Sequence, residues 1–288
     1  MEYRRPSLPG RRMRIHSLRV QPIDLLAVDI DFTLVDAERR IPEANARALR
    51  GAREAGMHIV LASGRIASSL RLFAEELGLP TPLVACNGAF VLDEAGDVLA
   101  DHRLGQEVVE VVVRECERRG VHLNVYADDK VHFAQESAMA EMYLRRARRS
   151  VPVILPWAAL TRLQPNKLIA VGEPRILEDL RLWAEEALPG GSSVVTYSEP
   201  EYLEFLCPDC DKGTGLASIA GTLGVPRERT AAIGDYLNDV PMLAWAGHSA
   251  AVANAVPEAK AAADVVVGSH EECGVAEYVA MLLKNVGK

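Results

Sequence analysis

The stretch Ile23-Asp24-Leu25-Leu26-Ala27-Val28-Asp29-Ile30-Asp31-Phe32-Thr33 decides the fold of this 288-residue chain. Its apolar run over residues 23–30, broken early by Asp24 and carrying Asp29 near its end, is typical of a strand buried on both faces of a parallel sheet. Asp29 and Asp31 stand at the carboxyl end of this run. Open α/β sheets bind ligands in the crevice beyond the carboxyl ends of their strands. We therefore expect both carboxylates to reach one such crevice.

Strands and helices alternate after this run. A helix that Pro42 opens and Gly56 ends is followed by a strand, a helix and a strand at residues 57–62, 66–77 and 83–86. The alternation returns later in the chain, with buried strands at residues 202–206, 230–233, 249–252 and 263–267 and helices between them. Such alternation forms parallel sheets. The sequence predicts a doubly wound, Rossmann-like α/β core.

The pattern changes between the two halves of this core. Hairpins with turn-forming clusters at residues 93–97 and 128–129 take the place of βαβ units. A mixed sheet with helices on one face accounts for this block. We therefore expect a core domain at residues 21–88 and 198–288 and an inserted α+β cap at residues 89–197.

The first 20 residues form a basic segment, with arginines at positions 4, 5, 11, 12, 14 and 19. The segment lacks the apolar stretch of a secretory signal. A poorly ordered, solvated arm is the simplest interpretation. An electrostatic docking arm and a targeting segment are the alternatives.

The composition excludes several classes of protein. A formal net charge of -8 argues against a surface that binds duplex nucleic acid. No stretch approaches the roughly 20 apolar residues that a membrane-spanning helix needs. With 49% hydrophobic residues the chain can build one large or two ordinary cores. We expect a globular protein with no nucleic-acid or membrane partner, and nothing in the sequence indicates an oligomeric state.

The five cysteines are too few and too dispersed for the disulfide framework of a small secreted domain. They favour a reducing cytoplasm. Cys207-Pro208-Asp209-Cys210 has C-x-x-C spacing, but a structural zinc site needs four ligands and no second pair is present. Inert loop thiols, a redox-sensitive pair and a metal site therefore stay open as interpretations.

Two further carboxylates follow another buried strand, in Gly234-Asp235-Tyr236-Leu237-Asn238-Asp239. Asp235 and Asp239 can share the crevice of Asp29 and Asp31. Two like charges about 4 Å apart repel by roughly 4 kcal/mol at an effective dielectric near 20, so the cluster needs a cation or protons. An all-oxygen site favours Mg²⁺ over zinc.

Two polar residues at predicted helix starts have both a structural and a functional interpretation. Ser63, in Ser63-Gly64-Arg65, is a helix cap or directs its hydroxyl and the following amides at an anion. Lys212 is a solvated lysine or a phosphate clamp, although a lysine at this end of a helix is unfavourable to the helix dipole.

Along the chain there are four motifs, and in their order they resemble those of the haloacid dehalogenase superfamily. They are Asp29-Ile30-Asp31-Phe32-Thr33, Ser63-Gly64-Arg65, Lys212 and Gly234-Asp235-Tyr236-Leu237-Asn238-Asp239. The resemblance spans Ile23 to the C-terminus. The long insertion and the segments Cys86-Asn87-Gly88-Ala89 and Glu272-Cys273-Gly274-Val275-Ala276 are similar to the Cof-like subfamily of sugar-phosphate phosphatases. The resemblance implies that Asp29 attacks phosphorus to give an aspartyl-phosphate. It also implies that Asp31 protonates the leaving alcohol and then deprotonates water.

The same resemblance implies a ligand set. Mg²⁺ would be held by Asp29, Asp235 and the backbone carbonyl of Asp31, with Asp239 in support. The residues expected to bind the phosphoryl group are Thr33, Ser63, Lys212 and Asn238. Asn87 and Gly88 are expected on the substrate side, although Asn-Gly is also a plain turn.

The resemblance implies a magnesium-dependent phosphomonoester hydrolase whose substrate is a small phosphate ester, such as a sugar phosphate. A phosphosugar mutase on the same scaffold and a non-catalytic phosphate-binding module are the alternatives. Phe32 departs from the glycine usual in the subfamily, and we expect it to narrow the entrance or alter flap motion. Unassigned candidates for specificity in the cap are His122, Tyr126, His132 and Lys167.

Overall fold

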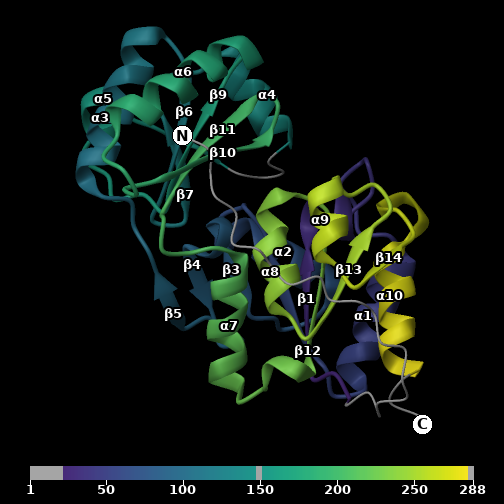
Figure 1. Ribbon diagram of the computed structural model, residues 1–288. Coiled ribbons are helices and arrows are strands. Elements are labelled where there is room, and N and C mark those ends of the chain that lie inside the picture. Colours follow the sequence, from purple (N-terminus) through teal and green to yellow (C-terminus); the bar gives the residue numbers. More distant parts are fainter. Residues whose placement is uncertain (1–21, 147–150, 285–288) are drawn as a thin grey trace.

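The computed structural model describes residues 22–146 and 151–284, so the basic arm expected at residues 1–20 lies outside the described residues. Two sheets dominate the described chain. Figure 1 shows them as two bodies, a larger one that carries both ends of the described sequence and a smaller one made of the middle of the chain. No helix in the described ranges is long and apolar enough to span a bilayer.

The larger body, the core, contains an eight-stranded sheet in the order β14-β13-β12-β1-β2-β3-β4-β5. Its parallel strands are β1 (Leu25–Asp29), β2 (His58–Ala62), β3 (Leu83–Ala85), β12 (Thr230–Gly234), β13 (His248–Val252) and β14 (Val265–Val267). The strands β2 and β3, which follow β1 in the sequence, lie on one side of it, and β12, β13 and β14 lie on the other side. The predicted doubly wound core is confirmed, and β1 lies where the strand order reverses.

Helices cover both faces of the core sheet (Figure 1). On one face α1 (Glu43–Glu54) packs against α10 (Gly274–Lys284), and α2 (Ala67–Leu77) lies beside them. The other face carries α7 (Lys212–Leu223), α8 (Val240–Trp245) and α9 (Pro257–Ala262). Every residue of β1 and β12 is buried, as expected for strands with helices on both sides.

The smaller body, the cap, contains a six-stranded sheet in the order β10-β11-β9-β6-β7-β8. Its strands are β6 (His122–Ala127), β7 (Lys130–Phe133), β8 (Val153–Ile154), β9 (Lys167–Val171), β10 (Val194–Glu199) and β11 (Tyr202–Leu206). Its helices are α3 (Gln106–Arg119), α4 (Ala138–Arg146), α5 (Trp157–Leu160) and α6 (Pro174–Ala187).

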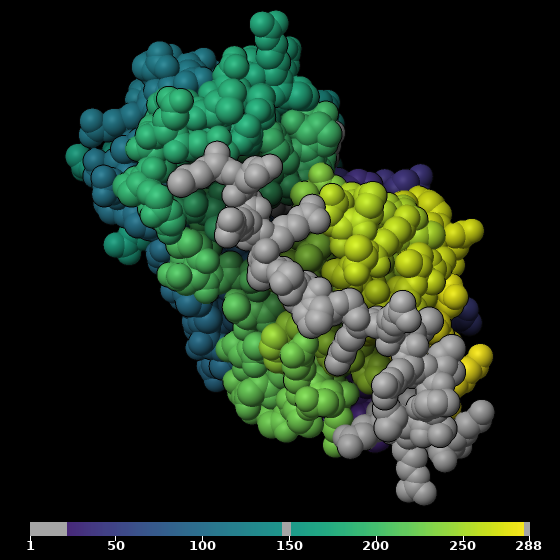
Figure 2. All heavy atoms as spheres, in the orientation of Figure 1, coloured from purple at the N-terminus to yellow at the C-terminus, as the bar shows by residue number. Residues whose placement is uncertain are grey.

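The two faces of the cap sheet pack differently. Helices α3 and α6 contribute residues such as Val112 and Leu180 to a hydrophobic cluster on one face. The other face joins Phe133 and Ile169 of the cap to Ile66 of the core in a second cluster. The space-filling view shows the teal and green cap residues directly against the core (Figure 2). This shared cluster holds the cap over the carboxyl ends of the core strands.

Three strands belong to a different sheet from the one we expected. β4 (Phe90–Leu92) and β5 (Val98–Asp101), expected in the cap, extend the core sheet, because a tight turn at Cys86–Gly88 folds β4 back antiparallel on β3. β11, expected in the core, pairs with β10 and β9 because only a short turn separates it from β10. The strand pairing therefore moves the cap limits expected at residues 89 and 197 to positions after β5 and after β11.

Candidate active site

The chain makes an irregular turn directly after β1, at Ile30–Leu34. Within it Asp31 is extended, whereas Phe32 has φ 58° and ψ 13°, in the left-handed region. For a residue with a Cβ this conformation costs about 1–2 kcal/mol. The turn places Thr33 beside the neighbouring strand, where its hydroxyl donates to Asp235 Oδ1 at 3.2 Å.

A buried lysine links the predicted carboxylates. Lys212 Nζ lies 2.7 Å from Asp29 Oδ1 and 2.6 Å from Asp239 Oδ1. Lys212 is the first residue of α7, whose start Asp211 caps by accepting a hydrogen bond from the Thr214 amide. Although burial opposes ionisation, Asp239 and Asp29 raise the pKa of Lys212, so this side chain is a cation. Lys212 therefore bridges Asp29 and Asp239, and its role as a phosphate clamp stays a prediction.

Asp239 organises the loop that carries Asp235. Its Oδ2 accepts hydrogen bonds from the backbone amides of Asp235 and Tyr236, at 2.9 and 3.0 Å. A Cβ on Gly234 would lie only 2.5 Å from the Asp239 side chain, so this approach requires glycine. Both oxygens of Asp239 are thus engaged, which suits a supporting position.

Asp29, Asp235 and Asp239 form a cluster whose oxygens lie within 4.8 Å of one another. Burial, followed by Asp239, raises the pKa of Asp29 to about 7, although Lys212 opposes the shift. Burial, followed by Asp29 and Asp239, raises the pKa of Asp235 to about 9. If all three carboxylates were ionised, they would carry more negative charge than Lys212 balances, and the raised pKa values reflect this crowding, which a bound cation would relieve. Their hard oxygen donors fit a divalent cation such as Mg²⁺.

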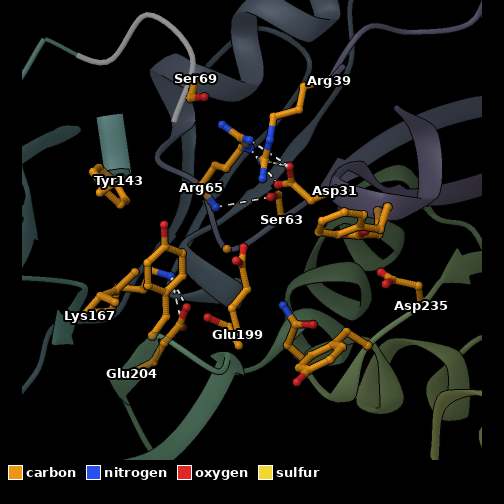
Figure 3. Close-up of a pocket in the computed structure, with 18 of the residues that line it drawn as sticks. Asp31, Arg39, Ser63, Arg65, Ser69, Tyr143, Lys167, Glu199, Glu204 and Asp235 are labelled. Atoms are coloured by element: carbon orange, nitrogen blue, oxygen red, sulfur yellow. Dashed lines mark hydrogen bonds and ion pairs between the residues drawn. The ribbon is translucent and has the colours of Figure 1, made fainter. Parts of the chain in front are cut away.

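The carboxylate of Asp31 faces two arginines, Arg39 and Arg65, rather than Asp235 (Figure 3). Arg65 makes two hydrogen bonds of 2.8 Å to its carboxylate, and Arg39 makes one of 2.6 Å. Burial alone would raise the pKa of Asp31, but Arg65 and Arg39 outweigh it and the net shift is downward. The sequence motif contained Arg65, whereas nothing in the sequence singled out Arg39.

The remaining predicted residues divide into two groups. Ser63 and Asn238 line the same cavity as Asp29, and Ser63 Oγ accepts from the amide of Arg65 at 3.3 Å. Asn87 and Gly88 do not line the cavity. Asn87 is buried and bonds to Asn238 at 3.0 Å, and a Cβ on Gly88 would lie 2.0 Å from the Asp211 carbonyl. Gly88 is thus required for close packing of the backbone.

The cavity has a volume of about 480 Å³ and lies between core and cap. Its cap wall includes Tyr126, Tyr143, Ile169 and a buried ion pair in which Lys167 Nζ lies 3.1 Å from both carboxylate oxygens of Glu204. Figure 3 shows Tyr143, Lys167 and Glu204 among the side chains that line the cavity. Glu204, Tyr143 and Glu199 were missed from the sequence. Glu199 and Glu204 lie on the strands β10 and β11, where a carboxylate within a buried run was the available signal for Glu204, and Tyr143 lies on α4.

The other two cap candidates lie away from the cavity. His122 bonds to Asn124 at 3.0 Å, and His132 to the Val125 carbonyl at 3.3 Å. Neither histidine lines the cavity. Both are buried, so their contacts indicate roles in packing the cap.

The C-x-x-C segment lies between β11 and α7. Cys210 Sγ donates to the Cys207 carbonyl at 3.7 Å, and both thiols are free. Burial, together with Cys207, raises the pKa of Cys210 well above its usual range. A thiol in this setting is a poor nucleophile.

Comparison with known proteins identifies the family and supports the fold. A family model described as haloacid dehalogenase-like hydrolase matches residues 26–279. Phosphatase YwpJ of Bacillus subtilis is 26% identical over 283 residues, covering 90% of this chain and 99% of that protein. The 5-amino-6-(5-phospho-D-ribitylamino)uracil phosphatase YwtE of the same species is 26% identical over 282 residues, covering 90% of this chain and 98% of that protein. A haloacid dehalogenase-like hydrolase from Bacteroides thetaiotaomicron superposes with a TM-score of 0.83 at 25% identity, covering 90% and 99%.

Proposed function

This chain belongs to the haloacid dehalogenase-like hydrolases and is a phosphatase, and we propose that it hydrolyses small phosphomonoesters through an aspartyl-phosphate on Asp29. One observation carries the proposal. Lys212 contacts only Oδ1 of Asp29, and no described residue donates a hydrogen bond to Oδ2. Asp29 also lines the cavity. One oxygen is therefore held in place while the other is available to attack phosphorus.

In the first step the Asp29–phosphorus bond forms and the bond from phosphorus to the ester oxygen breaks. Asp29 attacks as a carboxylate, which the neighbouring Lys212 favours. Asp29 and Asp235, with the backbone carbonyl of Asp31, would hold Mg²⁺, which when bound neutralises charge on the phosphoryl group. Thr33, Ser63, Lys212 and Asn238 are the proposed donors to the phosphoryl oxygens.

Asp31 is the proposed acid and base. It would give a proton to the leaving alcohol and then take one from the water that attacks the aspartyl-phosphate. In the described conformation Arg39 and Arg65 keep Asp31 ionised, which suits the second step. Protonation for the first step requires Asp31 to loosen at least one of these contacts as substrate binds.

The substrate class follows from the cavity. A volume of about 480 Å³ suits a small metabolite, and the cap above it excludes water during transfer. The name of YwtE describes a phosphorylated polyol that carries a uracil. We propose phosphorylated sugars and polyols as the substrates of this chain.

The free cysteines support a proposed location in a reducing cytoplasm. Cys86, Cys116 and Cys207 are buried and the other two are partly buried, and none of the five forms a disulfide in the described chain. Disulfides are rare in that compartment because cellular thiols keep cysteines reduced.

A phosphate-release screen with and without Mg²⁺ tests the proposed function. The panel should contain sugar phosphates, nucleotides, flavin mononucleotide and pyridoxal phosphate. Magnesium-dependent release of free phosphate is the expected result. An isomerised sugar phosphate without phosphate release would instead identify a mutase, and inactivity across the panel would favour a non-catalytic phosphate-binding module.

A further inference from the structure

Phe32 has a strained backbone and an exposed apolar side chain, and both features are unfavourable for folding. Its φ of 58° is a conformation that glycine adopts without steric cost and phenylalanine does not. Its side chain is also 43% exposed, so the ring adds little to the hydrophobic core. Strained residues of this kind cluster at functional sites. Phe32 lines the cavity, which is where an exposed ring can act on a ligand.

The Phe32 ring is held by its neighbours on two sides. The His270 ring packs edge-on against it at 5.8 Å between centroids, and the Arg39 guanidinium lies 5.8 Å from the ring centre. The backbone is fixed as well, because Asn254 donates to the Phe32 carbonyl at 2.9 Å and accepts from the His270 amide at 3.0 Å. These neighbours line the cavity too. The ring is thus a preorganised part of the cavity wall.

The cations of this wall already have carboxylate partners. Arg39 and Arg65 contact Asp31, and Lys167 contacts Glu204. Glu199 adds a further carboxylate to the lining (Figure 3). Among the described residues that line the cavity, no lysine or arginine is left without an acidic partner. Within the described part of the chain, a leaving group with a second negative charge would therefore meet no unpaired lysine or arginine on this wall.

The cap side of the cavity is largely apolar near the ion pair. The hydroxyls of Tyr126 and Tyr143 bond to each other at 2.5 Å, and Lys167 Nζ lies 4.8 Å from the centre of the Tyr126 ring, so Tyr143 is the tyrosine whose ring is not covered by this lysine. Ile169 lines the cavity beside them. Aromatic rings pair favourably with other rings in stacked or edge-to-face arrangements. Phe32 on the core side and Tyr143 and Ile169 on the cap side therefore give the cavity apolar surface against which a flat ring can pack.

We propose that Phe32 is a specificity-determining residue that packs against a planar ring in the leaving group of the substrate. The leaving group accordingly carries an aromatic or heteroaromatic ring and no second negative charge. This inference rests on the proposed function and narrows its substrate class to phosphate esters that bear such a ring.

Three synthetic esters test the inference. Benzyl phosphate and cyclohexylmethyl phosphate have similar size and release primary alcohols, but only the first is planar. 4-Carboxybenzyl phosphate adds a negative charge to the same ring. We expect kcat/KM for benzyl phosphate to exceed that for each of the other two by at least about fivefold.

Variants at Phe32 test whether this residue is the source of the preference. Phe32→Gly and Phe32→Leu should reduce the ratio of kcat/KM between benzyl and cyclohexylmethyl phosphate to about twofold or less, whereas Phe32→Tyr should retain it. Phe32→Gly should melt no lower than the wild type, because glycine adopts this φ freely. A lost preference in a stable variant excludes misfolding as its cause.

The outcomes separate this inference from the proposed function. If the wild type releases phosphate from other esters but shows no preference for benzyl phosphate, or if Phe32→Gly and Phe32→Leu keep the preference, the role of Phe32 is wrong. A higher kcat/KM for 4-carboxybenzyl phosphate than for benzyl phosphate would contradict the inference that the leaving group carries no second negative charge. Only a wild type that hydrolyses no ester in the presence of Mg²⁺ would count against the proposed function itself.

Discussion

The carboxylate of Asp129, in the turn between β6 and β7 of the cap, accepts a hydrogen bond from the backbone amide of Ser68 in the first turn of α2, at 2.8 Å. Its other oxygen lies 3.0 Å from Arg71 of the same helix. Ile66 at the start of α2 supplies no side-chain cap. The cap therefore completes a core helix that begins directly after the Ser63-Gly64-Arg65 loop.

This contact predicts a difference between two neighbouring variants. Asp129→Gly should lower the free energy of unfolding by about 1 kcal/mol relative to Asp128→Gly, since glycine relieves the positive φ at both positions but only the first substitution removes a helix cap. Asp128→Gly is the matched control, because Asp128 also has a positive φ but makes only an exposed contact to Arg103. Urea denaturation measures both. Equal effects of the two substitutions would show that the Ser68 contact adds nothing to stability.

Metal binding should stabilise the folded protein through the carboxylate cluster. A divalent ion at about 100 times its dissociation constant adds about 2.7 kcal/mol. We therefore expect MgCl₂ to raise the melting temperature above that in NaCl of equal ionic strength. Asp235→Asn should abolish most of this rise and Asp97→Asn, in the exposed β4–β5 turn, should not. A rise that survives in Asp235→Asn would place the ion elsewhere.

Gly88 should be far more sensitive to substitution than another glycine with positive φ. A Cβ at Gly88 would collide with the Asp211 carbonyl, whereas a Cβ at Gly78 meets nothing within 4 Å. Gly78→Ala should cost about 1–2 kcal/mol of unfolding free energy for its backbone conformation. Gly88→Ala should cost about 2 kcal/mol more, since it adds overpacking. Chemical denaturation of the two variants measures both free energies of unfolding, and their difference is the cost of the collision with Asp211. Equal losses of stability in the two variants would contradict this collision.

His122 should make stability depend on pH. Burial lowers the pKa of His122 in the folded state, although its hydrogen bond to Asn124 opposes the shift. The unfolded state therefore binds the proton first, and stability falls as pH drops below the unfolded value of about 6.5. The slope is at most about 1.4 kcal/mol per pH unit. His122→Gln should flatten the pH profile of unfolding free energy between about pH 7.5 and 5.5, and an unchanged profile would contradict this origin.

Much of the candidate site could be predicted because its residues follow buried strands. Asp29 and Asp235 end or follow adjacent parallel strands, β1 and β12, so the sheet brings them together. The position of Lys212, 183 residues from Asp29, followed from motif order rather than from any local pattern. The ion pair between Arg39 and Asp31 could not be predicted from the sequence. Arg39 lies on a loop, and the contacts of a long loop side chain depend on the tertiary structure.

The assignment of strands to sheets depended on turns that the hydrophobic pattern does not describe. An antiparallel hairpin can extend either sheet with the same alternation. The left-handed conformation of Cys86 and Asn87 folds β4 onto the core. The Lys167–Glu204 pair was missed for a related reason, since placing β11 in the core separated two residues that lie on adjacent strands of the cap.

Phosphate release by Asp29→Asn tests the central claim most directly. Asp97→Asn serves as the control, and both are assayed in saturating Mg²⁺ with the best ester from the screen. Loss of the nucleophile should lower kcat by at least about a thousandfold while the fold persists by circular dichroism, and the control should match the wild type. Full hydrolysis by Asp29→Asn would contradict the account.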